Sequence, residues 1–342
     1  MEKQRTFFRD ETGRLRTAWR LTIAWAGVIL IHIIVAVAAV VVLVIIHLPG
    51  GGDAASFAKI LQEKEKVITY AVTFPYAALL VGFLMLLRRY LDRRPVRSMG
   101  LGRPERRPSS SVGVGLGLGL ALAVAPALPL WACGALRWKG FPGCWEPAVL
   151  IPVLAVAAFT EEIVCRGYSY QNFLDIRRPV VGLFATALLF WAMHAFNPQV
   201  WSSPIPAVNL FAAGVLLALA YRMSGNIWFP TALHFGWNFA QGGVLGLAIS
   251  GREVAGLVRL APSPAVPSWL SGGAFGLEGS IVSILAQAAL IALFLWILHR
   301  RKASERNENA GINPPPTAPL TCSDTSTDSS PPSAKETRHE VL

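Results

Sequence analysis

Three ionisable residues lie close together in an apolar run that begins at Pro147: Glu161, Glu162 and Arg166, in the segment FTEEIVCRGY. Residues four positions apart share one face of a helix, so Glu162 and Arg166 can form an ion pair. Glu161 lies about 100° around the helix from Glu162 and faces a different neighbour. The spacing predicts one carboxylate that is mainly part of a charge pair holding the site, and a second carboxylate, Glu161, that is free.

Two histidines occur with the same four-residue spacing in later apolar runs. Phe190 and His194 are paired in this way in FWAMHAFN, and His234 and Asn238 in TALHFGWNFAQ. Asn238 can hydrogen-bond His234 or a substrate carbonyl. Two imidazoles and the free carboxylate, Glu161, can orient and deprotonate a water, or can bind Zn²⁺ with a water in its open position. Both mechanisms use the same residues, so spacing leaves both open.

The elements that position these residues are expected to be transmembrane helices. Of the 342 residues, 53% are hydrophobic and only 15% are charged, whereas the charged fraction of soluble proteins is about 25%. Runs of about 20 apolar residues are long enough to cross the hydrocarbon core as helices. Eight such runs occur, at about residues 20–47, 67–87, 111–136, 147–170, 180–197, 205–223, 226–249 and 280–298. The predicted fold is all-α, a polytopic transmembrane helical bundle of about eight spans.

The net charge of +11 is distributed unevenly between the loops. Lys and Arg crowd the N-terminus, the loop at 88–107 and the segment after the last span, while alternate loops have fewer. Cytoplasmic loops carry such an excess, which predicts that both termini are cytoplasmic. The same distribution disfavours a nucleic-acid partner. No Asp lies in an expected span, so Glu161 and Glu162 are the expected buried acids.

Composition divides the chain into five parts. These are a basic cytoplasmic N-terminus at 1–20, spans one to three at 20–136, a core of spans four to seven at 145–249, the last span at 280–298, and a Pro/Ser/Thr-rich tail at 303–342. The tail is expected to be disordered and cytoplasmic, because it cannot bury enough apolar surface to offset the entropy of ordering.

Two smaller patterns lead to further expectations. Gly113 with Gly117, and Gly115 with Gly119, have the small-xxx-small spacing that lets helices approach closely in lipid. Two cysteines, at positions 133 and 144, lie near the outer ends of spans three and four; they can pair in an oxidising compartment or remain separate thiols.

The expected depths of the three candidate residues in the membrane do not all agree. Counted at 1.5 Å per residue, Glu161 lies about 10 Å and His234 about 12 Å from the cytoplasmic face, but His194 lies about 21 Å from it. If the three residues meet, the span that carries His194 must tilt or begin deeper in the membrane.

Taken together, the motifs resemble those of a known family. EEIVCR matches the pattern EExxxR, FWAMH matches FxxxH, and HFGWN matches HxxxN/D, in that order and each in a separate apolar run. Over about residues 145–245 the chain resembles the CPBP family of intramembrane proteases, also called the CAAX-protease and bacteriocin-processing, or Abi, family, which includes the Rce1-type CAAX endopeptidases. Each motif alone is weak, whereas the ordered set is specific.

The resemblance implies a peptide hydrolase whose site opens toward the cytoplasm. The implied site residues are Glu161, Glu162, Arg166, His194, His234 and Asn238. Glu161 would activate the attacking water, the two histidines would orient that water and stabilise the oxyanion, and Asn238 would assist as a donor. The Glu–Arg pair would shape the pocket. A multi-pass protein of a bacterial plasma membrane is expected.

The implied partners are the lipid bilayer and a peptide or protein substrate. Prenylated CAAX tails, bacteriocin precursors and other small membrane peptides are all consistent with the resemblance, and the oligomeric state is left open. No cofactor is needed in the metal-free mechanism. In the metal-dependent one, Glu161, His194 and His234 would bind a divalent metal such as zinc.

A transporter or scaffold that uses the same polar cluster for ions or protons is the alternative. Many transporters are built from inverted repeats with broken spans in matched halves, whereas here the polar groups are confined to spans four, five and seven. Other intramembrane proteases fit less well, since the sequence has neither HExxH nor two membrane aspartates. Peptide cleavage that depends on Glu161 would distinguish a protease from a transporter.

Overall fold

The computed structural model describes residues 7–47, 54–102, 108–143 and 145–312. For 46–47, 54–67, 108–111 and 305–312 the description covers the backbone alone. Most of the predicted disordered tail lies outside these ranges. Cys144 does too, so its pairing with Cys133 stays a prediction.

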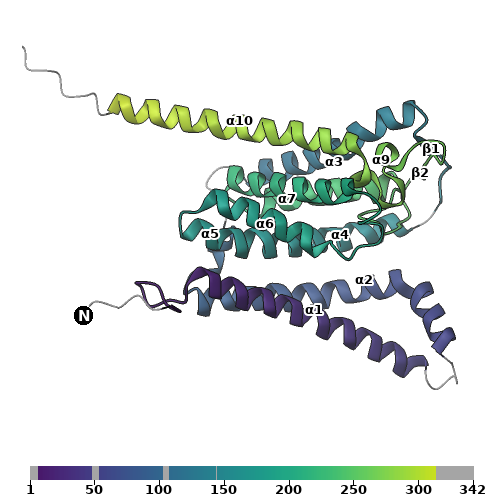
Figure 1. Cartoon of the computed structure of the whole chain (residues 1–342), viewed down its shortest axis with the longest axis horizontal. Coiled ribbons are helices and arrows are strands. Elements are labelled where there is room, and N and C mark those ends of the chain that lie inside the picture. The colour runs from purple at the N-terminus through teal and green to yellow at the C-terminus, as the bar shows by residue number, and fades with distance from the viewer. Residues whose placement is uncertain (1–6, 48–53, 103–107, 144, 313–342) are drawn as a thin grey trace, which may run out of the picture. The chain divides into compact units, whose positions relative to one another are not determined.

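The described chain is helical apart from one short antiparallel strand pair and loops, which confirms the all-α class (Figure 1). Up to Leu298 it forms one compact unit. The elements are α1 (Thr17–His47), α2 (Ala54–Leu86), η2 (Leu87–Leu91), η3 (Val96–Met99), α3 (Pro108–Ala132), β1 (Leu136–Trp138), α4 (Glu146–Glu162), η4 (Ile163–Tyr170), α5 (Gln171–Asp175), α6 (Pro179–Met193), α7 (Pro204–Ser224), α8 (Trp228–Asn238), η5 (Phe239–Val244), β2 (Leu260–Pro262), α9 (Ser268–Ser271), η6 (Gly273–Phe275), η7 (Leu277–Gly279) and α10 (Ile281–Ile312).

Six helical segments of the described chain are long and apolar enough to cross a membrane. They are Thr17–Ile45, Ile68–Leu91, Val112–Ala132, Glu146–Asp175, Pro204–Ser224 and Ile281–Ser304. The other two expected spans are shorter. One is α6, with fifteen residues, and the other consists of α8, with eleven residues, followed by η5, with six. At 1.5 Å per residue they extend about 22 and 26 Å, less than the roughly 30 Å of a hydrocarbon core. The count of eight spans and the cytoplasmic placement of both termini stay predictions.

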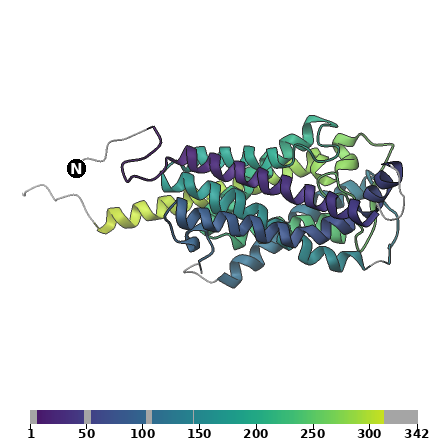
Figure 2. The ribbon, with the colours of Figure 1, turned by 90° about the horizontal axis from the view of Figure 1, so that it is seen from below.

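The helices lie side by side, and α1 and α2 run together along one face (Figure 2). One end of the bundle holds β1, β2 and α9 (Figure 1). We call this the loop end, made of residues 133–145, 195–203 and 245–280. The opposite end is the basic end, made of residues 7–16, 87–102 and 176–178. The helix α6 and the segment α8–η5 both end before they reach the loop end of the bundle. After each of them the chain turns back.

Glycines let α3 and α8 pack backbone against backbone. A methyl group on Gly119 would overlap the carbonyl of Leu233, and one on Gly115 would lie 2.6 Å from the carbonyl oxygen of Phe229. Gly113 and Gly117 have no such neighbour, since nothing lies within 4 Å of the added carbon. The predicted close packing is therefore confirmed for one glycine pair, while the other faces away. This contact fixes the helix that carries His234.

Charged residues are also buried at the basic end, which the sequence analysis did not predict. Asp92, just after η2, is fully buried and forms ion pairs with Arg20 at 3.2 Å and Arg88 at 3.1 Å. Arg88 also pairs with Asp175 at 2.8 Å. Asp92 further accepts hydrogen bonds from Tyr168 and Asn172. The expectation of buried acids covered only the expected spans: Glu162 is buried as expected, but Asp92, beyond the end of the expected span at 67–87, is buried as well because neighbouring helices enclose it. We call these six residues the Asp92 cluster.

Candidate active site

The first motif lies where an α-helix widens into a π-helix. Glu161 and Glu162 end α4, and Arg166 lies within η4, the kind of π-helical segment often found at functional sites. The predicted ion pair is present: Arg166 Nη1 lies 2.9 Å from Glu162 Oε1, and both side chains are fully buried. Arg166 Nη2 also donates to the carbonyl of Gly214 in α7 at 2.8 Å. The pair thus ties α4 and η4 to α7.

Both histidines are oriented by bonds at Nδ1. His194 Nδ1 lies 2.7 Å from the carbonyl oxygen of Phe190, and His234 Nδ1 lies 3.1 Å from Glu162 Oε1. A carbonyl oxygen and a carboxylate oxygen only accept, so each Nδ1 is the donor, and Nε2 of each neutral ring carries a lone pair. The bond to Glu162 joins residues 72 positions apart, and spacing within one helix had not predicted it.

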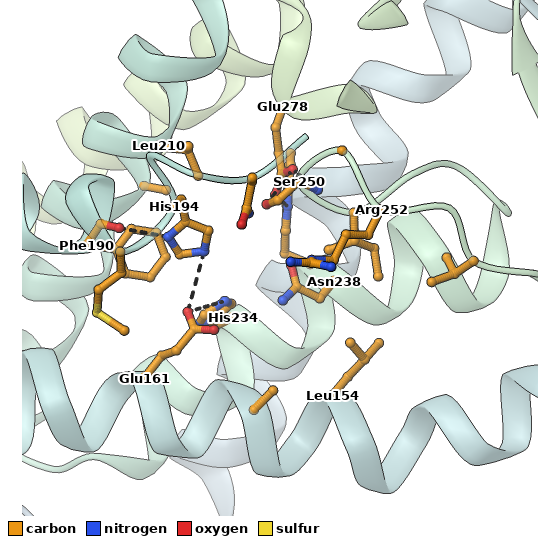
Figure 3. Close-up of a pocket in the computed structure, with 18 of the residues that line it drawn as sticks. Leu154, Glu161, Phe190, His194, Leu210, His234, Asn238, Ser250, Arg252 and Glu278 are labelled. Carbon is orange, nitrogen blue, oxygen red and sulfur yellow. Dashed lines mark hydrogen bonds and ion pairs between the residues drawn. The ribbon is translucent and has the colours of Figure 1, made fainter. Parts of the chain in front are cut away.

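The two Nε2 atoms point toward Glu161 (Figure 3). Glu161 Oε2 lies 3.7 Å from His194 Nε2 and 3.9 Å from His234 Nε2, and this oxygen is buried without a hydrogen-bond partner. We call these three residues the Glu161 triangle. Three acceptor atoms therefore converge with no donor among them, an arrangement that calls for a water, a proton or a cation at their centre.

The expected difference in depth between Glu161 and His194 disappears in the structure. The helical segment that contains Glu161 continues to Asp175, beyond the expected end at residue 170. Glu161 is therefore about 21 Å from the end of that segment, and His194 follows fifteen residues of α6, or about 22 Å. The same count places His234 only about 9 Å along α8, so α8 must begin deeper in the bundle than α6 for the three residues to meet.

The triangle lies at the bottom of a cavity of about 740 Å³. The walls are mostly apolar, and Asn238 lines them as well (Figure 3). Exposed residues of the lining include Thr69, Pro198 and Arg252, which lie toward the loop end. The cavity thus opens toward the loop end rather than toward the basic end. This differs from the cytoplasmic opening that the resemblance implies, if the basic end is cytoplasmic.

A buried acid in the cavity wall, Glu278, was not among the predicted site residues. It accepts hydrogen bonds from Trp237 Nε1 at 3.3 Å, from the backbone N–H of Ser250 at 2.6 Å and from Ser250 Oγ at 2.9 Å. Burial raises the pKa of Glu278 above its ordinary value. Its signal in the sequence was a single acid between glycines, GLEGS, directly before the last span. Glu278 fastens the chain at the cavity mouth to α8.

Two sides of the triangle are slightly longer than a bound zinc ion would require. Within the part of the chain that the structure describes, no group of three or more His, Cys, Asp and Glu side chains forms a complete metal-binding set. A tetrahedral zinc with bonds of about 2.0–2.2 Å separates its ligand atoms by roughly 3.3–3.6 Å. The sides of 3.7 and 3.9 Å exceed this by a few tenths of an ångström. One carboxylate oxygen and two imidazole nitrogens are also ligands that zinc takes, so the donor types fit.

Comparison with known proteins identifies the region that contains the site. A family model described as type II CAAX prenyl endopeptidase Rce1-like matches residues 143–240. The matched region includes every residue of the three motifs. No curated protein and no solved structure matches the chain.

Proposed function

We propose that this chain, whose residues 143–240 match the family model of Rce1-like type II CAAX prenyl endopeptidases, hydrolyses a peptide bond with a water held by the Glu161 triangle. The observation that carries the proposal is the convergence of Glu161 Oε2 with the Nε2 atoms of His194 and His234 at 3.7 and 3.9 Å. A water at their centre can donate one hydrogen to the carboxylate and the other to an imidazole.

Glu161 acts as the general base in this mechanism. It takes a proton from the water as the water oxygen bonds to the scissile carbonyl carbon. The proton then passes to the amide nitrogen as the C–N bond breaks, which leaves a carboxylic acid and an amine. Neutral His194 and His234 orient the water through their Nε2 lone pairs. Either ring can donate to the oxyanion only after it has gained a proton.

Asn238 and the Glu162–Arg166 pair support this chemistry. Asn238 supplies an N–H donor for the oxyanion from the cavity wall, independently of the histidines. Glu162 holds the His234 ring through Nδ1, and Arg166 neutralises Glu162. If zinc is bound, Glu161, His194 and His234 would hold it, and it would supply Lewis-acid polarisation of the carbonyl and a more acidic water.

The shape of the cavity argues against transport. Within α4, α7 and α8, the cavity-lining residues nearest the basic end are Glu161, Leu217 and Leu233. Beyond them the Asp92 cluster is tightly packed. A transporter would need a second opening on that side.

We further propose that the substrate is a membrane-associated peptide that enters from the loop end. By the positive-inside rule the loop end faces away from the cytoplasm. The side of entry can be tested with single cysteines at two exposed positions, Ser202→Cys at the loop end and Arg93→Cys at the basic end, in a chain whose other exposed cysteines are replaced by serine. A membrane-impermeant maleimide should label only the first variant in intact cells. Labelling of only the second would reverse the proposed side of entry.

The proposed hydrolysis is tested with purified full-length protein in bilayer discs and fluorogenic peptides, unmodified and prenylated. The wild type should cleave at least one class, and Glu161→Gln should lower the rate by about 10²–10⁴-fold. Glu11→Gln, at an exposed position of the N-terminal segment, is the control for loss of a carboxylate. Loss of activity with a chelator and recovery with zinc would assign the metal-dependent mechanism. Ion flux without cleavage of any peptide would favour the transporter.

A further inference from the structure

Two carboxamide side chains meet in the wall of the cavity, apart from the Glu161 triangle. Gln287 Nε2, from α10, donates to Asn209 Oδ1, from α7, at 2.7 Å. Both residues line the cavity, and their exposed fractions are 0% for Asn209 and 2% for Gln287. Neither side chain is ionisable, and neither residue was among the predicted site residues.

Each amide keeps one polar group without a partner. Asn209 Nδ2 and Gln287 Oε1 are buried and make no hydrogen bond. If both amides are rotated by 180°, the bond between them is kept, and the free groups become the Asn209 oxygen and the Gln287 nitrogen. In either arrangement the pair offers one N–H donor and one carbonyl acceptor. Such buried groups are normally satisfied, so a bound partner is the expected complement.

The amide pair lies at about the depth of the catalytic carboxylate. α4–η4 and α7 run in the same direction, because Arg166 contacts Gly214 and, further along both segments, Gln171 contacts Tyr221. Glu161 precedes Arg166 by five residues, and Asn209 precedes Gly214 by five. Each therefore lies about 6–8 Å toward the loop end from the Arg166 contact.

We propose that Asn209 and Gln287 form a subsite that hydrogen-bonds an amide group of the substrate while its scissile bond lies at the Glu161 triangle. A peptide amide has one N–H and one C=O, which match the free acceptor and the free donor of the pair. The inference rests on the proposed peptidase function and adds a determinant of substrate recognition to it. The amide belongs either to the substrate backbone or to an Asn or Gln side chain of the substrate.

The test uses a double variant chosen to preserve folding. Asn209→Leu with Gln287→Met replaces both amides by apolar side chains of similar size, so neither is left with an unpaired buried partner. In the full-length protein, kcat/KM for a cleaved peptide should fall about tenfold or more while thermal stability is kept. A series of the same peptide, N-methylated at one backbone amide at a time, then locates the contact.

The decisive result is a loss of discrimination. Methylation of one backbone amide should weaken cleavage by the wild type about tenfold and should have little effect on the double variant. A parallel peptide series replaces each Asn and Gln side chain of the substrate. If cleavage is sensitive only to one of these replacements, the subsite recognises that side chain instead. Equal sensitivity of wild type and double variant to every change would overturn the subsite and leave the pair as a structural contact between helices.

Failure of the proposed function can be separated from failure of the subsite. Binding of the fluorescent peptides is measured by anisotropy to Glu161→Gln with and without the two amide substitutions. If no peptide is cleaved but the amide substitutions weaken binding, the subsite stands and the hydrolytic mechanism does not. If peptides are cleaved and the amide substitutions change neither binding nor kcat/KM, the subsite is wrong and the peptidase stands.

Discussion

The Asp92 cluster and the Glu161 triangle are both groups of charged and polar residues inside a helical bundle, but they differ in how their acids are satisfied. Asp92 is fully buried, and both of its oxygens are engaged: Oδ1 accepts from Tyr168 and forms an ion pair with Arg20, and Oδ2 accepts from Arg88 and Asn172. Glu161 is 26% exposed at the bottom of a cavity, and its Oε2 has no donor at all.

The comparison shows how burial of charge can serve stability in one place and chemistry in another. Removing one partner from a buried ion pair is costly because the other is left as an uncompensated charge. A buried carboxylate whose two oxygens are both engaged by cations and donors is poorly placed to take a proton from water. A carboxylate oxygen that faces a cavity and has no hydrogen-bond donor can take a proton from water. We therefore infer that the Asp92 cluster stabilises the fold and that the Glu161 triangle carries out the proposed chemistry.

The largest expected effect is on catalysis at the triangle. His234→Ala removes one of the two atoms that orient the water and should lower cleavage by about 10²–10⁴-fold. Combining it with Glu161→Gln should lower the rate little further, because residues that act as one unit are not additive. His32→Ala, at a histidine whose ring packs edge-on against Tyr76, is the control and should cleave normally. Multiplicative losses in the double variant would show that the two residues act separately.

The second prediction affects both stability and activity. Arg166→Ala leaves Glu162 buried without its cation, and Glu162 also holds His234. The free energy of unfolding should fall by about 3–5 kcal/mol, measured by thermal unfolding in detergent, and cleavage should fall with it. Arg166→Lys keeps the charge and should recover part of the stability. A variant without the arginine that melts like the wild type would mean that Glu162 is solvated.

The third prediction separates the two regions. Arg88→Ala removes a cation that joins Asp92 to Asp175 and should destabilise the protein by about 3 kcal/mol. Because the Asp92 cluster lies outside the cavity, kcat/KM per folded molecule should stay within about threefold of the wild type. A selective loss of kcat/KM in samples shown to be folded would place the Asp92 cluster in the catalytic machinery.

The smallest expected effect concerns the packing that positions His234. Gly119→Ala forces a methyl group against the backbone of α8 and should cost about 1–3 kcal/mol. Gly117→Ala, on the open side of the same helix, should cost nothing measurable. Thermal unfolding of the two variants side by side tests the contact. Equal melting temperatures would mean that α3 and α8 are not packed as described.

Helical spacing predicted the local part of the site and little beyond it. The pairing of Glu162 with Arg166 was predicted from a four-residue separation, whereas for Phe190 and His194 the same separation predicted a shared face but not the bond from His194 to the Phe190 carbonyl. The bond between His234 and Glu162 depends on how two helices pack, which no spacing within one helix specifies. The opening of the cavity depends on how the chain after α8–η5 folds back, which spacing within one helix does not specify either.

A buried charge was predicted where a charged residue contrasts strongly with its neighbours in the sequence. Glu161 stands out in an apolar run, whereas Asp92 lies in a stretch of arginines that resembles a solvated loop. Nothing in composition distinguishes an arginine in water from one enclosed by neighbouring helices. Glu278 escaped notice for the same reason, because it precedes its span rather than interrupting it.

The most direct test of the account is a single comparison of Glu161→Gln with Asp92→Asn, measured on the same purified samples for peptide cleavage and thermal unfolding. Both substitutions replace a carboxylate by an amide of the same shape. Glu161→Gln should melt at or near the wild-type temperature and cleave at least 10²-fold more slowly. Asp92→Asn should melt well below the wild type and, while folded, cleave at a rate near that of the wild type. Near-wild-type turnover by folded Glu161→Gln would contradict the mechanism.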